Sequence, residues 1–245
     1  MQAFDFHASL QDCEVVVIGG GTGIGFATAL AAKARGARIT LIGRDATKLK
    51  AAAIQLGGAS ISVADIADRA SVEAALAGLT RIDHLVITAG SLLAGKLAES
   101  DPDMLLKALQ ERIAGPLYAI KASLTKMPGT GSIVLMGGQF SDRPAGNGTA
   151  VISAAVRGIE GLARALALEL APIRVNVISP GFIDTPLFDV LGAEGRQTVL
   201  AQAAATLPVG RVGHPEEVAR GIAFLLTNGY MTGEVLHIDG GGRLV

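Results

Sequence analysis

The chain has one cysteine, no tryptophan and only two tyrosines among its 245 residues. Because Cys13 is alone, neither an intrachain disulfide nor a cysteine-based metal cluster can form. We therefore expect a protein without a metal site that works in a reducing compartment, the cytoplasm.

Long apolar runs and an excess of one charge sign are also missing. No uncharged apolar stretch reaches the roughly 18 residues of a membrane span, and residues 1–13 lack the basic start and apolar stretch of a signal peptide. Lys and Arg number 21 and Asp and Glu number 22, which leaves a net charge of −1. Neither a membrane nor a nucleic-acid partner is expected from these features.

Half of the residues are apolar, and short runs rich in Val, Ile and Leu alternate with longer helical patterns. Such continuous apolar runs are typical of strands buried on both faces. The predicted strands are residues 14–18, 38–42, 60–64, 84–87, 132–136, 174–178 and 235–238. The predicted helices are residues 25–35, 47–56, 67–78, 102–127, 152–170 and 215–226. This alternation predicts one α/β domain over residues 1–245, a doubly wound Rossmann fold whose seven-stranded parallel sheet carries helices on both faces.

Three regions lie outside these elements. Residues 1–12 form an N-terminal extension, and residues 137–150 and 181–211 are the longest stretches without a regular pattern. Ligands of doubly wound folds bind at the carboxyl ends of the strands. We therefore expect residues 181–211 to be the substrate-loop region that covers the pocket.

A glycine-rich turn joins the first predicted strand to an Ala-rich helix. Glycines at 19, 23 and 25 would allow a sharp turn, a close approach to a pyrophosphate and tight helix–strand packing. The helix N-terminus would offer free amides to the phosphates. A flexible turn without a ligand is the alternative, but the strand–turn–helix context favours a dinucleotide site. Its predicted residues are Gly19, Gly21, Thr22, Gly23, Ile24 and Gly25.

The sequence resembles the short-chain dehydrogenase/reductase family over nearly its whole length. The resemblance is carried by the glycine spacing, by Thr88-Ala89-Gly90 after the fourth strand, and by residues 174–185, 207–218 and 232–241. It implies an acid facing the adenine at Asp65 and a nicotinamide-side segment that binds through backbone groups and the Thr185 hydroxyl. The further cofactor residues that it implies are Asp65, Ile66, Ala89, Gly90, Pro180, Gly181, Ile183 and Thr185.

The end of the second predicted strand bears on the choice of dinucleotide. NAD-dependent enzymes of this type commonly place an acid there, which binds the ribose and repels a 2′-phosphate. Gly43 stands at that position, and Arg44 follows it with a guanidinium suited to a phosphate. We interpret Asp45 as the N-cap of the next helix. NADP(H) is therefore predicted over NAD(H), with a solvated surface role as the alternative for Arg44.

The resemblance also implies four catalytic positions, and each carries an unexpected residue. The Tyr and Lys positions fall on Ile152 and Val156, the Ser position on Gly138, and the Asn position on Arg112. A one-residue shift would put Ser153 and Arg157 at the Tyr and Lys positions but break the match along the rest of the helix. The proton-transfer half of the site is therefore predicted to be lost, while the cofactor half is kept.

Three functions stay open at this point. The first is an atypical NADP(H)-dependent oxidoreductase that reduces an activated acceptor such as a quinone or enone, with Arg112 stabilising the acceptor oxygen or serving a structural role. The second is a non-catalytic sensor or scaffold, and the third is a partner subunit of an active copy. The Ala- and Leu-rich helices at 102–127 and 152–170 predict a homodimer or homotetramer.

Other polar residues are weaker candidates. Ser141, Asp142, Arg143 and Asn147 follow the fifth strand and are candidate readers of a polar substrate, with an ordinary polar loop as the alternative. The four isolated histidines are interpreted as structural. These are His7, His84, His214 and His237.

Overall fold

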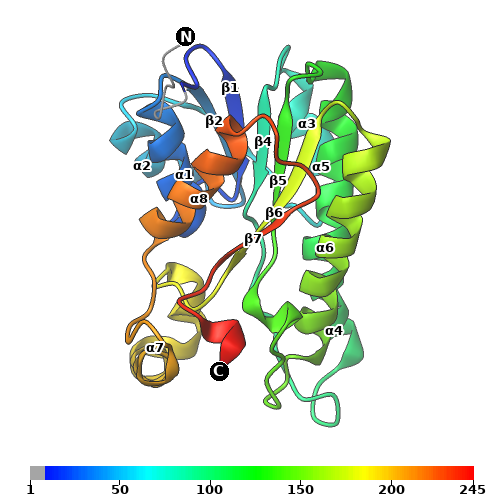
Figure 1. Ribbon diagram of the computed structural model, residues 1–245. Coiled ribbons are helices and arrows are strands. Elements are labelled where there is room, and N and C mark those ends of the chain that lie inside the picture. Colours follow the sequence, from blue (N-terminus) through cyan, green and yellow to red (C-terminus); the bar gives the residue numbers. More distant parts are fainter. Residues whose placement is uncertain (1–8) are drawn as a thin grey trace.

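The computed structural model describes residues 9–245 and contains a single seven-stranded parallel sheet (Figure 1). The strand order is β3-β2-β1-β4-β5-β6-β7. The strands are β1 (Glu14–Ile18), β2 (Arg38–Gly43), β3 (Ser60–Val63), β4 (His84–Ile87), β5 (Ser132–Met136), β6 (Arg174–Pro180) and β7 (Val235–Ile238). The predicted fold class is confirmed, and the main differences in the strands are the extra residues at the ends of β2 and β6.

Helices cover both faces of the sheet, because each strand buries side chains alternately on either side. In β1, Val15 and Val17 belong to one buried cluster, while Val16 and Ile18 belong to the other. Figure 1 shows α1, α2 and α8 on one side and α3, α5 and α6 on the opposite side. These helices are α1 (Gly23–Lys33), α2 (Ala46–Gln55), α3 (Arg69–Ala77), α5 (Gly115–Ser123), α6 (Ala150–Glu169) and α8 (Pro215–Thr227).

The long helix predicted over residues 102–127 is interrupted. It consists of α4 (Pro102–Leu109), a π-helical turn (Gln110–Ala114), α5 and a short 3₁₀ turn (Leu124–Lys126). The π turn adds a residue to one turn of the helix and so changes which side chains face the sheet. Such turns are frequent at functional sites.

The region 181–211 is helical, so its prediction as irregular structure was wrong. It forms a 3₁₀ helix (Pro186–Leu191) and α7 (Gly192–Thr206). The only fully buried residue of α7 is Ala203, so its sequence lacks the apolar stripe by which a helix is recognised. In Figure 1, α7 and the C-terminal end lie at the same end of the sheet.

The structure also bears on two predictions near the N-terminal half of the sheet, the N-cap of α2 and the N-terminal extension. The Asp45 carboxylate accepts hydrogen bonds from the amides of Thr47 and Lys48, which confirms its predicted role as the N-cap of α2. Within the predicted N-terminal extension, Leu10 is buried in the core beneath α1. Residues 1–8, including His7, lie outside the described residues.

Among residues 9–245, no helix combines the length and apolar character needed to cross a membrane.

The strand order places a crevice at the carboxyl ends of the central strands. Strand β1 lies between β2 and β4, where the chain reverses direction across the sheet, and this is where doubly wound folds bind ligands.

His84 makes the stability of this sheet depend on pH. It is buried at the start of β4, and its Nδ1 lies 2.8 Å from Oγ of Ser132 on β5. Burial lowers the pKa of His84 to about 4, although Asp83 opposes the shift. Between pH 6.5 and 4 the unfolded chain therefore binds more protons than the folded chain. The free energy of unfolding should fall by about 3 kcal/mol as the pH drops through this window.

Urea denaturation at several pH values would measure this slope. A His84→Gln variant should lose most of it, since glutamine keeps a hydrogen-bonding group but takes up no proton. Identical pH dependence in the parent protein and the variant would contradict this role of His84.

Candidate functional site

A cavity of about 500 Å³ opens at the carboxyl ends of the central strands. The glycine turn, the segment after β4, the π turn and the segment after β6 line it. All of the residues predicted to bind the cofactor lie in this lining except Asp65. Sequence motifs more than a hundred residues apart are thus brought to a single pocket.

The glycine turn is held in a conformation that side chains would disturb. Gly19 and Gly23 adopt positive φ angles of 92° and 54°. A Cβ on Gly25 would overlap the carbonyl oxygen of Gly19 and lie 2.6 Å from Oγ1 of Thr88. The first turn of α1 is therefore pressed against the end of β1 at a distance that glycine alone permits.

The N-terminus of α1 is suited to an anion. Thr22 is its N-cap residue, and the Thr22 side chain makes no capping hydrogen bond. Thr22, Gly23 and Ile24 line the cavity, so the amides of this first turn lie at its wall. Unpaired amides and the helix dipole favour a phosphate at this position.

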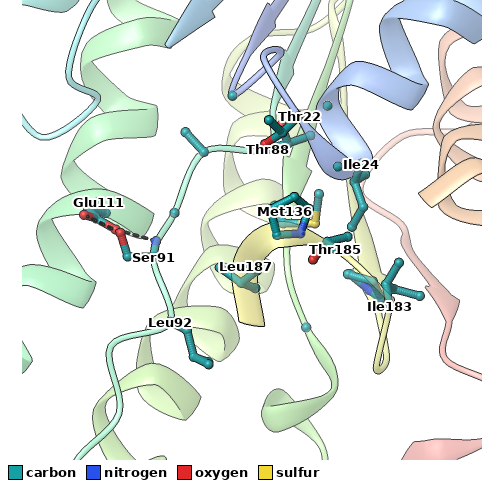
Figure 2. A pocket seen from close by; sticks show the side chains of 18 of the residues that line it. Thr22, Ile24, Thr88, Ser91, Leu92, Glu111, Met136, Ile183, Thr185 and Leu187 are labelled. Carbon is teal, nitrogen blue, oxygen red and sulfur yellow. Dashed lines mark hydrogen bonds between the residues drawn. The ribbon is translucent and has the colours of Figure 1, made fainter. Parts of the chain in front are cut away.

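The segment after β6 lies across from the turn. A Cβ on Gly23 would lie 3.4 Å from the Thr185 side chain, so the two segments are in near contact. Figure 2 shows Thr185 and Ile183 on this side of the pocket, together with Leu187 from the following 3₁₀ helix. Phe188 and Val190 also belong to the lining. This wall is largely apolar, apart from the Thr185 hydroxyl.

A hydrogen-bonded pair on the opposite wall is not evident in the sequence. The amide of Ser91 donates to Oε2 of Glu111 at 2.6 Å, and its hydroxyl donates to Oε1 at 3.1 Å (Figure 2). Nη1 of Arg44 lies 3.8 Å from the same Oε1, and its Nη2 lies 3.5 Å from Oγ of Ser91. The predicted phosphate-binding arginine is thus linked to the π turn by a weak ion pair.

Arg112, the residue after Glu111, is a buried cation in the cavity wall. Only 9% of it is exposed, and its Nη2 donates to the carbonyl of Ser91 at 3.1 Å. Its Nε has no hydrogen-bond partner among the described residues. Burial lowers the pKa of Arg112, and the Glu111 carboxylate opposes this shift. Gly90 makes room for the guanidinium, since a Cβ there would lie 3.1 Å from its central carbon.

The other three predicted catalytic positions meet in the same wall. Ile152 and Val156 are buried on one face of α6 and line the cavity with Gly138. A Cβ on Gly138 would lie 3.7 Å from Cγ1 of Val156. These three residues offer no hydroxyl and no ammonium group, and Arg112 lines the same cavity.

Some predicted residues lie elsewhere. The Asp65 carboxylate accepts from the amide of Ala67 and shapes the turn before α3. Asp142 binds Arg157 and His237 rather than entering the cavity. The other candidates of that loop are also outside the lining: Ser141, Arg143 and Asn147.

Lys48 was not predicted from the sequence as a site residue. It lies on α2 and lines the cavity beside Gly21. Its place in the first turn of the helix that follows Arg44 is the only sequence signal for it. Together Arg44 and Lys48 give this end of the cavity two cations.

Parallel strands, a glycine turn on the first helix and a pocket at the switch point define a Rossmann-type dinucleotide-binding protein. A family model described as enoyl-(acyl carrier protein) reductase matches residues 19–242. A human 3-oxoacyl-[acyl-carrier-protein] reductase is 33% identical over 243 residues, which cover 96% of this chain and 100% of the relative. The chain therefore belongs to the short-chain dehydrogenase/reductase family.

Solved structures agree with this assignment. A small-chain dehydrogenase in complex with NADPH has a TM-score of 0.84 and 30% identity, and the match covers 96% of this chain and 100% of that chain. A blue fluorescent protein from a metagenomic library, also in complex with NADPH, has a TM-score of 0.86 and 30% identity, with 96% and 99% covered.

The contact between α1 and β1 yields a prediction about Gly25. A Gly25→Ala variant should lose about 1–3 kcal/mol of stability, because the methyl group has no space beside Gly19 and Thr88. Gly78→Ala is a matched control, since Gly78 ends α3 with helical angles and nothing lies within 4 Å of a Cβ there. Chemical denaturation of both variants would measure the difference, and equal stabilities would refute the close contact.

Proposed function

We propose that this protein is an NADP(H)-dependent oxidoreductase that reduces an activated acceptor, such as a quinone or enone, without the tyrosine acid usual in its family. The observation that carries the proposal is the composition of the cavity wall. Beside an intact glycine turn it has the apolar Ile152 and Val156, the bare Gly138 and one buried cation, Arg112.

The residues of the cavity fit a phosphorylated dinucleotide. The open first turn of α1 suits a pyrophosphate. Gly43 leaves no acid at the end of β2, and Arg44 and Lys48 add positive charge where a 2′-phosphate would lie. The NADPH bound in two similar solved structures also supports NADP(H) over NAD(H).

Arg44 provides a test of this choice. Its side chain is 61% exposed and only loosely tied to Glu111, so it is free to turn toward a phosphate. An Arg44→Ala variant should bind NADPH at least about tenfold more weakly, the loss expected for one charge-assisted contact, with unchanged affinity for NADH. Fluorescence titration of both cofactors would measure this.

Arg220→Ala is a suitable control for that titration, because Arg220 is exposed on α8 and does not line the cavity. Equal affinities of the parent protein for NADPH and NADH, unaffected by Arg44→Ala, would rule out the NADP(H) assignment.

The chemistry follows from what the wall can and cannot supply. Bound NADPH would supply a hydride, which in an enone adds to the carbon β to the carbonyl while electrons move to the oxygen. The Arg112 guanidinium lines the cavity, and its positive charge would stabilise that oxygen. Because arginine stays protonated in proteins, it stabilises the anion without delivering a proton. Water would protonate the product afterwards.

Magnitudes favour an activated acceptor over a simple ketone. General acid catalysis contributes about 10²–10⁴-fold, and its usual residues are absent from the predicted positions. A donor to a developing oxyanion contributes about 10²–10³-fold, which Arg112 can provide. Enolates and hydroquinone anions are weak bases compared with alkoxides, so their formation needs less help from an acid.

A screen of NADPH oxidation with quinones, enones and ketones tests this function. We expect turnover with quinones or enones, and kcat should fall about 10²-fold in Arg112→Gln while NADPH affinity is kept. Arg143→Gln is the matched control, since Arg143 is exposed and outside the cavity lining.

Two results would count against the proposal. Ordinary rates with simple ketones would mean that a proton donor has been overlooked. Tight NADPH binding without turnover of any acceptor would favour the alternative, a non-catalytic sensor, scaffold or partner subunit.

Assembly as a homodimer or homotetramer is part of the proposal. Apolar side chains on α4, α5 and α6 lie exposed at the surface of the chain, as expected for helices that pack against a second copy. They are Leu106, Leu117 and Leu168.

A further inference from the structure

A polar cluster lies outside the cavity, where three elements meet. His237 is on β7, Glu160 is on α6, and Asp142 follows the 3₁₀ turn Gln139–Ser141. Each offers one ligand atom, and these three atoms lie within 4.8 Å of one another. Nε2 of His237 is 3.0 Å from Oδ2 of Asp142.

The cluster contains a buried carboxylate that is only half satisfied. The Glu160 side chain is 2% exposed. Its Oε2 accepts from Nη1 of Arg157 at 2.8 Å, but its Oε1 has no partner among the described residues. A buried carboxylate oxygen without a donor is costly unless a cation or proton is supplied.

Arg157 only partly fills this need. It lies at the surface and bonds Oδ1 of Asp142 at 3.2 Å in addition to Glu160. One guanidinium therefore faces two carboxylates. Oδ2 of Asp142, Nε2 of His237 and Oε1 of Glu160 are left without a bond to Arg157, and of these Oδ2 and Nε2 are hydrogen-bonded to each other.

A second unpaired oxygen lies beside the cluster. Ser179 on β6 is the register partner of His237, and in adjacent parallel strands such partners point to the same face of the sheet. The Ser179 residue is fully buried, and its Oγ has no partner among the described residues. The alternation along β6 places it on the face that α6 covers, since Val175 and Val177 belong to the core cluster of that face.

We propose that Asp142, Glu160 and His237 form a binding site for a divalent cation of the Zn²⁺ type. Imidazole nitrogen and carboxylate oxygen both bind zinc, at about 2.0–2.2 Å, and a site with three protein ligands leaves a fourth position for water. One imidazole among so few oxygens fits Mg²⁺ or Ca²⁺ less well, because these ions prefer six or more oxygen ligands. No metal was expected from the sequence, because its one cysteine forms no cluster and its histidines are isolated, whereas these ligands come from three distant segments.

The site would act on structure rather than on hydride transfer. None of its three ligands lines the cavity, whereas Gln139 and Phe140, just before Asp142, do. A bound cation would tie this part of the cavity wall to α6 and β7. The inference therefore does not depend on the proposed function.

Calorimetric titration and thermal denaturation with ZnCl₂, after removal of metals by a chelator, test the site. Saturating Zn²⁺ should bind one per chain and raise Tm by about 5–10 °C at 100 times its Kd, and MgCl₂ should have little effect. His237→Gln and Asp142→Asn should each weaken Zn²⁺ binding at least about tenfold. His214→Gln, which changes an exposed histidine outside the cluster, should bind as the parent does.

The metal-free Tm of each variant separates loss of a ligand from loss of folding. His237→Gln should keep a metal-free Tm close to that of the parent, because the side chain is partly exposed and glutamine can still donate to Asp142. No Zn²⁺ binding by the parent, or equal binding by the parent and both ligand variants, would overturn the proposal.

Discussion

The contact of α1 with the end of β1 is the constraint on which the rest of the site depends. Gly25 lies so close to Gly19 and Thr88 that no side chain fits between them. This contact brings the first amides of α1 to the crevice between β1 and β4, and the segment containing Thr185 lies against the same turn. A single close approach of backbone to backbone thus sets both walls of the dinucleotide pocket.

The sequence predicted the sheet well, because strands buried on both faces are continuous apolar runs that leave little ambiguity. It predicted α7 as irregular because that helix buries almost nothing, so burial left no pattern in its residues. The π turn at Gln110–Ala114 was missed for a different reason. A shift of backbone hydrogen bonds by one residue has no characteristic side chain, yet it determines that both Glu111 and Arg112 are buried.

Within the candidate site, motif residues were located well and their partners were not. The glycines were predicted because their chemistry requires glycine at fixed spacing. The Ser91–Glu111 pair joins residues twenty positions apart whose proximity depends on the π turn. Asp65 belongs to the family pattern, but its carboxylate accepts a hydrogen bond from the amide of Ala67, two residues along the chain. A family pattern does not reveal such a local hydrogen bond.

The proposed function rests on a cavity wall in which Ile152 stands at the predicted tyrosine position and the buried Arg112 supplies the positive charge. A tyrosine both stabilises charge and gives up a proton, so it can complete the reduction of a ketone to an alcohol. An arginine stabilises charge but keeps its protons. In the proposed reaction, the reduced acceptor therefore leaves the hydride step as an anion that survives until water protonates it. Enolates and hydroquinone anions meet this condition, whereas an alkoxide does not, and for this reason the function proposed for the wall formed by Arg112, Ile152 and Val156 has a conjugated acceptor as its substrate.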